Sequence, residues 1–135
     1  MITRYAALLA LALCAGPVAA QDRAEAIAGV IDRQMEAFRA KDPTAAFEFA
    51  SPNIRGLFGN ADNFGRMVAN GYPPIWQPGE VRYLDLREEN GKLQQRVEVR
   101  DAEGRAHFFD YEMVETEAGW KINGVRPAAP PGIGV

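Results

Sequence analysis

Cysteine, histidine and excess positive charge are all scarce in this chain of 135 residues. The single cysteine, Cys14, excludes an intrachain disulfide and a metal site built on several thiolates. The single histidine, His107, has no clustered inward carboxylates beside it, so we expect neither a metal nor a cofactor. The 15 basic and 18 acidic residues give a formal charge of −3, which argues against a nucleic-acid-binding protein.

Long hydrophobic runs are also missing. The apolar run Tyr5 to Ala15 is too short for a membrane span of roughly 20 residues. Arg4 precedes it, Gly16-Pro17 breaks it, and Val18-Ala19-Ala20 offers the small residues that a signal peptidase reads. We therefore expect residues 1–20 to be a signal peptide and the protein to be periplasmic or secreted, without membrane contact after cleavage. A retained anchor is the alternative.

The remaining sequence predicts one α+β domain over residues 21–126. The 47% apolar and 24% charged composition is typical of a soluble globular protein. Residues 127–135 are rich in Pro, Ala and Gly, so we expect them to form a disordered tail.

The first half of the domain has helical patterns. Between Gln21 and Ala40 one apolar stripe recurs at steps of four, four and three, formed by Ile27, Ile31, Met35 and Phe38. Shorter helices are expected after the capping pairs Asp42-Pro43 and Ser51-Pro52, and after Asn60 or Asp62. The three prolines in Tyr72 to Gly79 predict a stiff, extended connection to the second half.

The second half, Glu80 to Arg126, predicts four antiparallel strands joined by three glycine-bearing turns. Asn90-Gly91 favours a two-residue hairpin that pairs Glu89 with Lys92, and Gly104 favours a three-residue loop that pairs Asp101 with Arg105. Counting from these turns opposes Leu84 to Val97, Leu86 to Gln95, His107 to Val99, Phe109 to Val97, Tyr111 to Gln95, Met113 to Leu93, Trp120 to Glu115 and Ile122 to Met113.

One face of this curved, cone-like meander is expected to be apolar and covered by the helices. It comprises Leu84, Leu86, Leu93, Val97, Val99, Phe109, Tyr111, Met113, Trp120 and Ile122. The other face is expected to be mostly solvated and comprises Arg96, Glu98, Asp110, Glu112, Lys121 and Asn123. Gln95, His107 and Tyr111 are polar groups on the covered face. Gln95 and Tyr111 lie opposite each other, close enough for a side-chain hydrogen bond, either as a satisfied core pair or as groups that face a ligand.

Several of these residues support a resemblance to a known superfamily. Met35 to Asp42, followed by Phe47, and the last strand Gly119 to Gly124 resemble the nuclear-transport-factor-2-like superfamily, also called SnoaL-like or cystatin-like. Ala50-Ser51-Pro52 and Tyr72-Pro73-Pro74 resemble a bacterial secreted family of unknown function more closely. The resemblance implies a cone-shaped α+β fold with a pocket at its open end, and says little about activity.

The favoured function is a non-catalytic module that binds a small apolar ligand or a partner protein. Gln95, Tyr111, His107, Tyr72 and Trp76 are the candidate ligand-binding residues. For Tyr72 and Trp76 the favoured alternative is that they fill the end of the sheet as ordinary core aromatics. Arg55 is a candidate anion-binding group at the rim, with plain solvation as the alternative.

Two other functions remain open. The resemblance implies an isomerase, dehydratase or cyclase as the alternative, with His107 as the weak candidate for acid–base catalysis. An aspartate is missing from the predicted inner face of the sheet, which favours binding over catalysis. The third reading is a homodimer formed through the outer face of the sheet, where Tyr83 and Phe108 are expected to be exposed.

Overall fold

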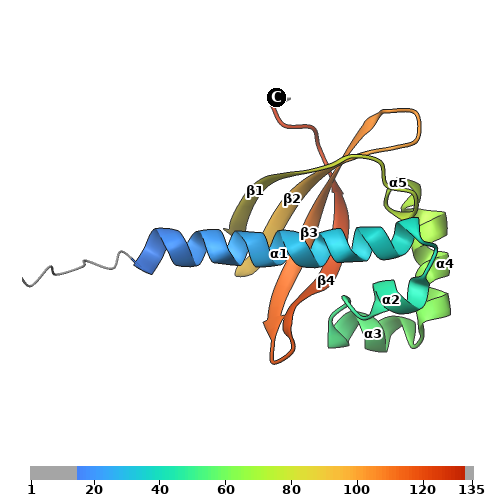
Figure 1. Cartoon of the computed structure of the whole chain (residues 1–135), viewed down its shortest axis with the longest axis horizontal. Coiled ribbons are helices and arrows are strands. Elements are labelled where there is room, and N and C mark those ends of the chain that lie inside the picture. Colours follow the sequence, from blue (N-terminus) through green and yellow to red (C-terminus); the bar gives the residue numbers. More distant parts are fainter. Residues whose placement is uncertain (1–14, 133–135) are drawn as a thin grey trace, which may run out of the picture.

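The computed structural model describes residues 15–132 and shows an α+β domain in which helices precede a four-stranded antiparallel sheet. The long helix α1, Ala15–Arg39, crosses one face of the sheet, and four short helices gather beyond its C-terminal end (Figure 1). These are α2 (Pro43–Phe47), α3 (Pro52–Phe58), α4 (Ala61–Gly71) and α5 (Pro73–Trp76). The strands are β1 (Val81–Glu89), β2 (Lys92–Arg100), β3 (Ala106–Thr116) and β4 (Gly119–Ala128), paired in sequence order.

The predicted stripe of α1 is confirmed. Ile27, Ile31, Met35 and Phe38 are all buried against the sheet and the short helices. Burial begins at Ile27, and the positions from Val18 to Ala26 are exposed or half-buried. Residues 1–14 of the predicted signal peptide lie outside the described residues, while Ala15 to Ala20 form the start of α1. Within residues 15–132 no helix is long and apolar enough to cross a membrane.

Three of the short helices begin at the predicted capping residues. Asp42 Oδ1 accepts a hydrogen bond from the backbone N–H of Ala45 at 3.1 Å, and Ser51 Oγ accepts one from Ile54 at 3.2 Å. Asn60, rather than Asp62, caps α4. Each side-chain oxygen satisfies a donor that the first helical turn leaves without a backbone partner.

The extended connection predicted for Tyr72 to Gly79 is wrong in its first half. Pro73 to Trp76 form the one-turn helix α5. Proline is tolerated in a first helical turn because the N–H it lacks would have no intrahelical acceptor there. The turn buries Ile75 and directs Trp76 against Phe38, with ring centroids 5.9 Å apart.

The turn-based registers are confirmed for β2, β3 and the hairpin between β3 and β4. Asn90 and Gly91 both have positive φ, as the two-residue hairpin requires, and Gly104 has a φ of 80°. β4 continues to Ala128, so Pro127 and Ala128, which were assigned to the tail, pair with Phe109 and Phe108.

The register predicted for the first half of β1 is wrong, because a β-bulge lies between Tyr83 and Leu86. Tyr83, not Leu84, pairs with Val97 and turns toward α1, where its hydroxyl donates to the carbonyl oxygen of Ala28 at 3.1 Å and hydrogen-bonds the Asp32 carboxylate. The alternation of apolar and polar residues in the sequence of β1 does not indicate that a bulge adds an extra residue to this strand. Tyr83 is therefore unavailable as an exposed aromatic on the outer face.

The outer face is also less solvated than predicted. Glu98 and Asp110 are buried there, and Asp110 accepts hydrogen bonds from Arg87 and Arg96, each at 2.9 Å. Burial of Asp110 favours its neutral form, but the hydrogen bonds from the two guanidinium groups outweigh it and hold its pKa at about 2. A charged network covers the centre of this face.

Candidate functional site

An apolar cavity lies between the short helices and β4, with a volume of about 200 Å³. Its wall includes the aromatic rings of Phe38, Phe58 and Phe64, whose centroids lie 5.8 to 6.0 Å from their neighbours. Apolar cavities of comparable volume accept small apolar molecules. The cavity is lined by Gln34, Phe38, Ala50, Ile54, Leu57, Phe58, Phe64, Met67, Val68, Tyr72, Ile75, Ile122, Gly124 and Val125.

Two polar side chains in this wall are held by backbone carbonyls. Gln34 is 3% exposed and its Nε2 donates to the carbonyl oxygen of Ala46 at 3.1 Å. The hydroxyl of Tyr72 donates to the carbonyl oxygen of Val125 at 3.0 Å. Both bonds join separate elements, so they fix the helices relative to one another and to β4. The lining is otherwise almost wholly apolar.

Leu57 on α3 lines the same cavity and is 73% exposed. Val18 is the other large apolar side chain exposed to a similar degree within residues 18–132. An isolated exposed leucine is ordinary, but Leu57 is continuous with an apolar cavity. It therefore extends the apolar surface of the cavity to the solvent.

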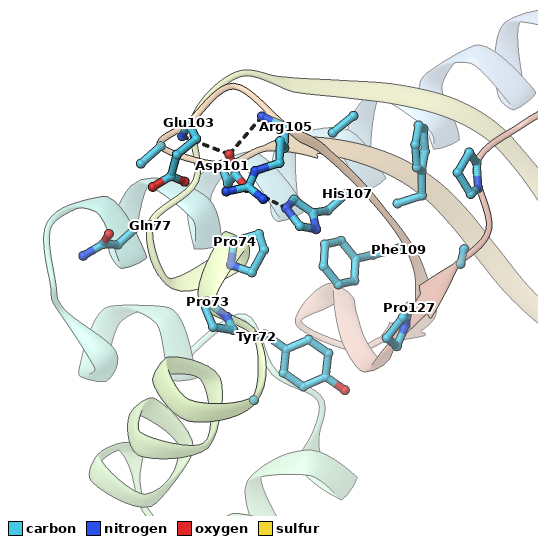
Figure 2. Close-up of a pocket in the computed structure, with 16 residues that line it drawn as sticks. Tyr72, Pro73, Pro74, Gln77, Asp101, Glu103, Arg105, His107, Phe109 and Pro127 are labelled. Atoms are coloured by element: carbon cyan, nitrogen blue, oxygen red, sulfur yellow. Dashed lines mark hydrogen bonds and ion pairs between the residues drawn. The ribbon is translucent and has the colours of Figure 1, made fainter.

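A second, wider cleft of about 690 Å³ lies on the other side of Tyr72, between the junction of α4 with α5 and the turn that joins β2 to β3. We call it the His107 cleft (Figure 2). It is lined by Gly71, Tyr72, Pro73, Pro74, Gln77, Asp101, Ala102, Glu103, Arg105, Ala106, His107, Phe108, Phe109, Pro127, Ala128 and Pro130.

An aspartate and the only histidine of the chain meet in this cleft. His107 Nε2 lies 2.8 Å from Asp101 Oδ2. The other carboxylate oxygen, Asp101 Oδ1, accepts the backbone N–H groups of Glu103 and Arg105, each at 2.9 Å. The bond to His107, together with those from the Arg105 and Glu103 backbone, lowers the pKa of Asp101 to about 2. Asp101 is therefore an ionised acceptor at neutral pH.

The predicted ligand-binding residues do not converge on one site. His107 and Tyr72 line the His107 cleft, and Tyr72 also lines the apolar cavity. Trp76 packs on Phe38, with the Lys41 ammonium 4.6 Å from its ring centroid. Arg55 is exposed, and its guanidinium lies 5.3 Å from the centroid of Phe47.

Gln95 and Tyr111 lie opposite each other as predicted, but the hydrogen bond between them is not made. Gln95 Nε2 donates instead to carbonyl oxygens that include that of Leu84, at 3.1 Å, in the β1 bulge. The Tyr111 hydroxyl is fully buried and has no hydrogen-bond partner in the described chain. Neither residue lines the apolar cavity or the His107 cleft. The side-chain amide of Gln95 thus donates to a backbone carbonyl oxygen in β1, at the bulge where the regular pairing of β1 with β2 is interrupted.

Sequence reasoning missed two features of these sites. The signal for the first was present in the sequence. Asp101 precedes the three-residue loop and His107 comes two residues after Arg105, which closes it, so the two side chains are close enough in the chain to meet. The second is the aromatic and apolar lining supplied by Leu57 and Phe58 on α3 and by Met67 on α4, which depends on how these two short helices lie beside β4. Helical periodicity does not determine that arrangement.

Comparison with known families gives one match. The family model described as "Domain of unknown function (DUF4864)" matches residues 20–134, nearly all of the chain. The chain belongs to the DUF4864 family. No curated protein and no solved structure matches this DUF4864 chain. The resemblance to the nuclear-transport-factor-2-like superfamily therefore stays an expectation.

Proposed function

We propose that this protein is a non-catalytic, secreted or periplasmic module that binds a small apolar molecule in the cavity beside α3, α4 and β4. One observation carries the proposal: an almost wholly apolar cavity of about 200 Å³ is continuous with the exposed side chain of Leu57. An apolar cavity of about 150 Å³ holds one benzene ring. The ligand class is therefore a single aromatic ring or a short alkyl chain.

The lining supports reversible uptake of such a ligand. Met67 is half-buried, unbranched and able to change rotamer at little cost. Ile54 and Leu57 come from α3, a short helix in which no residue is buried. A helix that buries few side chains opens locally at low free-energy cost. Movement of α3 is thus the simplest route by which a ligand enters.

The alternative, an isomerase, dehydratase or cyclase that uses His107, has support from the Asp101–His107 contact of 2.8 Å. However, His107 lies in the wider cleft and does not line the apolar cavity. A substrate in the apolar cavity would therefore be out of reach of the imidazole. This separation favours binding over catalysis in the cavity beside α3.

A homodimer through the outer face of the sheet remains a further proposal, with less support than the sequence indicated. Phe108 is half-buried on that face, whereas Tyr83 is turned toward α1. Gln94 and Glu98 each have a buried oxygen atom without a hydrogen-bond donor among residues 15–132. Both atoms are covered by their own chain, so they do not by themselves favour a partner.

The apolar-cavity proposal is tested by titrating the 15N-labelled protein with toluene. We expect saturable shifts confined to amides around the cavity, and loss of these shifts in Met67→Trp, which fills the cavity. Met67→Leu, which nearly conserves volume, is the matched control and should bind as the wild type does. Leu57→Ser, at an exposed position, should weaken binding without affecting the fold. Toluene shifts that persist unchanged in a folded Met67→Trp protein would contradict the proposal.

A further inference from the structure

The His107 cleft holds an oriented imidazole that binding in the apolar cavity does not use. Asp101 is ionised and can only accept hydrogen bonds, so the proton shared with it at 2.8 Å belongs to His107 Nε2. In a neutral imidazole the second nitrogen is then an acceptor. Within the described chain, Nδ1 of His107 has no hydrogen-bond partner.

Backbone hydrogen bonds and strand pairing position both members of this pair. Asp101 is fixed by two backbone N–H groups of its own turn, and its own N–H donates to the carbonyl oxygen of Arg105 at 2.9 Å. His107 lies on β3, paired with Val99 on β2. Carboxylate, turn and strand thus set both the tautomer and the ring orientation of His107 before any ligand arrives.

An apolar surface lies beside the imidazole. The rings of Phe109 and Tyr72 follow His107 down the cleft, with Pro74 on one side and Pro127 on the other (Figure 2). The rings of Tyr72 and Phe109 pack with their centroids 6.1 Å apart. A flat apolar ligand contacting these rings would place a substituent near Nδ1.

The charged side chains near His107 determine which chemical group of a ligand can lie beside Nδ1. Asp101 and Glu103 contribute two carboxylates, while Arg105 contributes one exposed guanidinium, 3.8 Å from Asp101. A permanently charged carboxylate would meet more repulsion than attraction here. A neutral hydroxyl has no such cost and can donate a hydrogen bond to Nδ1 of His107, whose side chain is 38% exposed.

We propose that the His107 cleft is a second binding site, for a small uncharged aromatic alcohol of the phenol type, whose hydroxyl group donates to His107 Nδ1. The site is independent of the apolar cavity, because the two share only Tyr72. The hydroxyl of Tyr72 already donates to the carbonyl oxygen of Val125, so Tyr72 contributes its aromatic ring to both sites.

Four ligands with the same ring test the assignment: p-cresol, 4-methylanisole, p-toluate and toluene. Phenols of this type are neutral at pH 7 because their pKa is about 10. We expect p-cresol to bind about tenfold more tightly than 4-methylanisole, the factor associated with one satisfied hydrogen bond, and more tightly than p-toluate. In His107→Phe, p-cresol and 4-methylanisole should bind alike. His107 is the only histidine, so the 15N signal of Nδ1 is unambiguous and should move on binding p-cresol.

The Met67→Trp variant separates this proposal from the first. It should abolish toluene binding beside α3 and leave the p-cresol site intact. Equal affinity for p-cresol and 4-methylanisole, an unmoved Nδ1 signal, tighter binding of p-toluate, or loss of p-cresol binding in Met67→Trp would each overturn the assignment. The Nδ1 measurement uses the wild-type protein, so it decides the matter even if His107→Phe does not fold.

Discussion

Asp110 shows how a single residue makes the outer face of the sheet depend on pH. Its side chain is about 10% exposed and is held by Arg87 and Arg96, which are 29% and 23% exposed. Its folded pKa of about 2 lies below the unfolded value of about 3.9. Ionised Asp110 therefore stabilises the fold fully above about pH 4, and this contribution is lost as the pH falls toward 2.

We predict that Asp110→Asn lowers the free energy of unfolding at pH 7 by about 1–2 kcal/mol, because it leaves two partly buried guanidinium groups without their carboxylate. The variant should also lose less stability than the wild type between pH 5 and pH 2. Urea unfolding across this pH range measures both effects. Glu117→Gln, an exposed change in the turn before β4, is the control. Parallel pH curves for wild type and Asp110→Asn would refute the account.

Single residues also explain which parts of the fold the sequence predicted. Asn90, Gly91 and Gly104 impose their turns through backbone conformation, and the registers counted from them are correct. The bulge in β1 is different, because Leu84 and Tyr83 are both large and apolar enough to face the core. Nothing in the alternation distinguishes them until the helix supplies Ala28 and Asp32 as partners for the Tyr83 hydroxyl.

At the scale of elements, α2 and α4 approach closely at Gly65. A Cβ atom added there would lie 2.8 Å from Pro43 Cβ, a contact that the rigid proline ring cannot relieve. By contrast, a Cβ atom at Gly56 on α3 meets no atom within 4 Å. The two glycines are both helical, so they separate the effect of packing from that of helix propensity.

We predict that Gly65→Ala destabilises the protein by about 1 kcal/mol, since the cost of overpacking, about 1–3 kcal/mol, exceeds the gain in helix propensity. Gly56→Ala should stabilise it by about 0.5–1 kcal/mol. Urea unfolding measures both changes in the free energy of unfolding, provided that the variants have the same m-value as the wild type. Stabilisation by Gly65→Ala would show that α2 and α4 are not packed as closely as described.

The way the short helices are placed relative to one another explains why the two separate cavities could not be predicted from the sequence. The capping residues located the starts of α2, α3 and α4, but the tilt of each helix depends on its neighbours. Pro73 and Pro74 predict an extended chain when read alone, yet both fit the first turn of α5. That turn separates the apolar cavity from the His107 cleft, which sequence reasoning had merged into a single pocket.

For the whole molecule, the helices cover one face of the sheet (Figure 1). The apolar cavity and the His107 cleft both have Tyr72 in their walls. The core formed by α1 and the sheet is filled by side chains such as Met35, Val97 and Tyr111. The apolar cavity and the His107 cleft both lie where short elements meet the strands. Tyr111 packs in the core and Gln95 is buried beside it, and neither of these predicted residues lines either cavity.

The most direct test of the central proposal is a set of nuclear Overhauser contacts between bound toluene and protein methyl groups in the wild-type protein. Our account predicts contacts with the methyl groups of Ile54, Met67 and Val125, which line the apolar cavity. Contacts only with Ala106 or Ala128, which line the His107 cleft, or no contacts at toluene saturation, would contradict it.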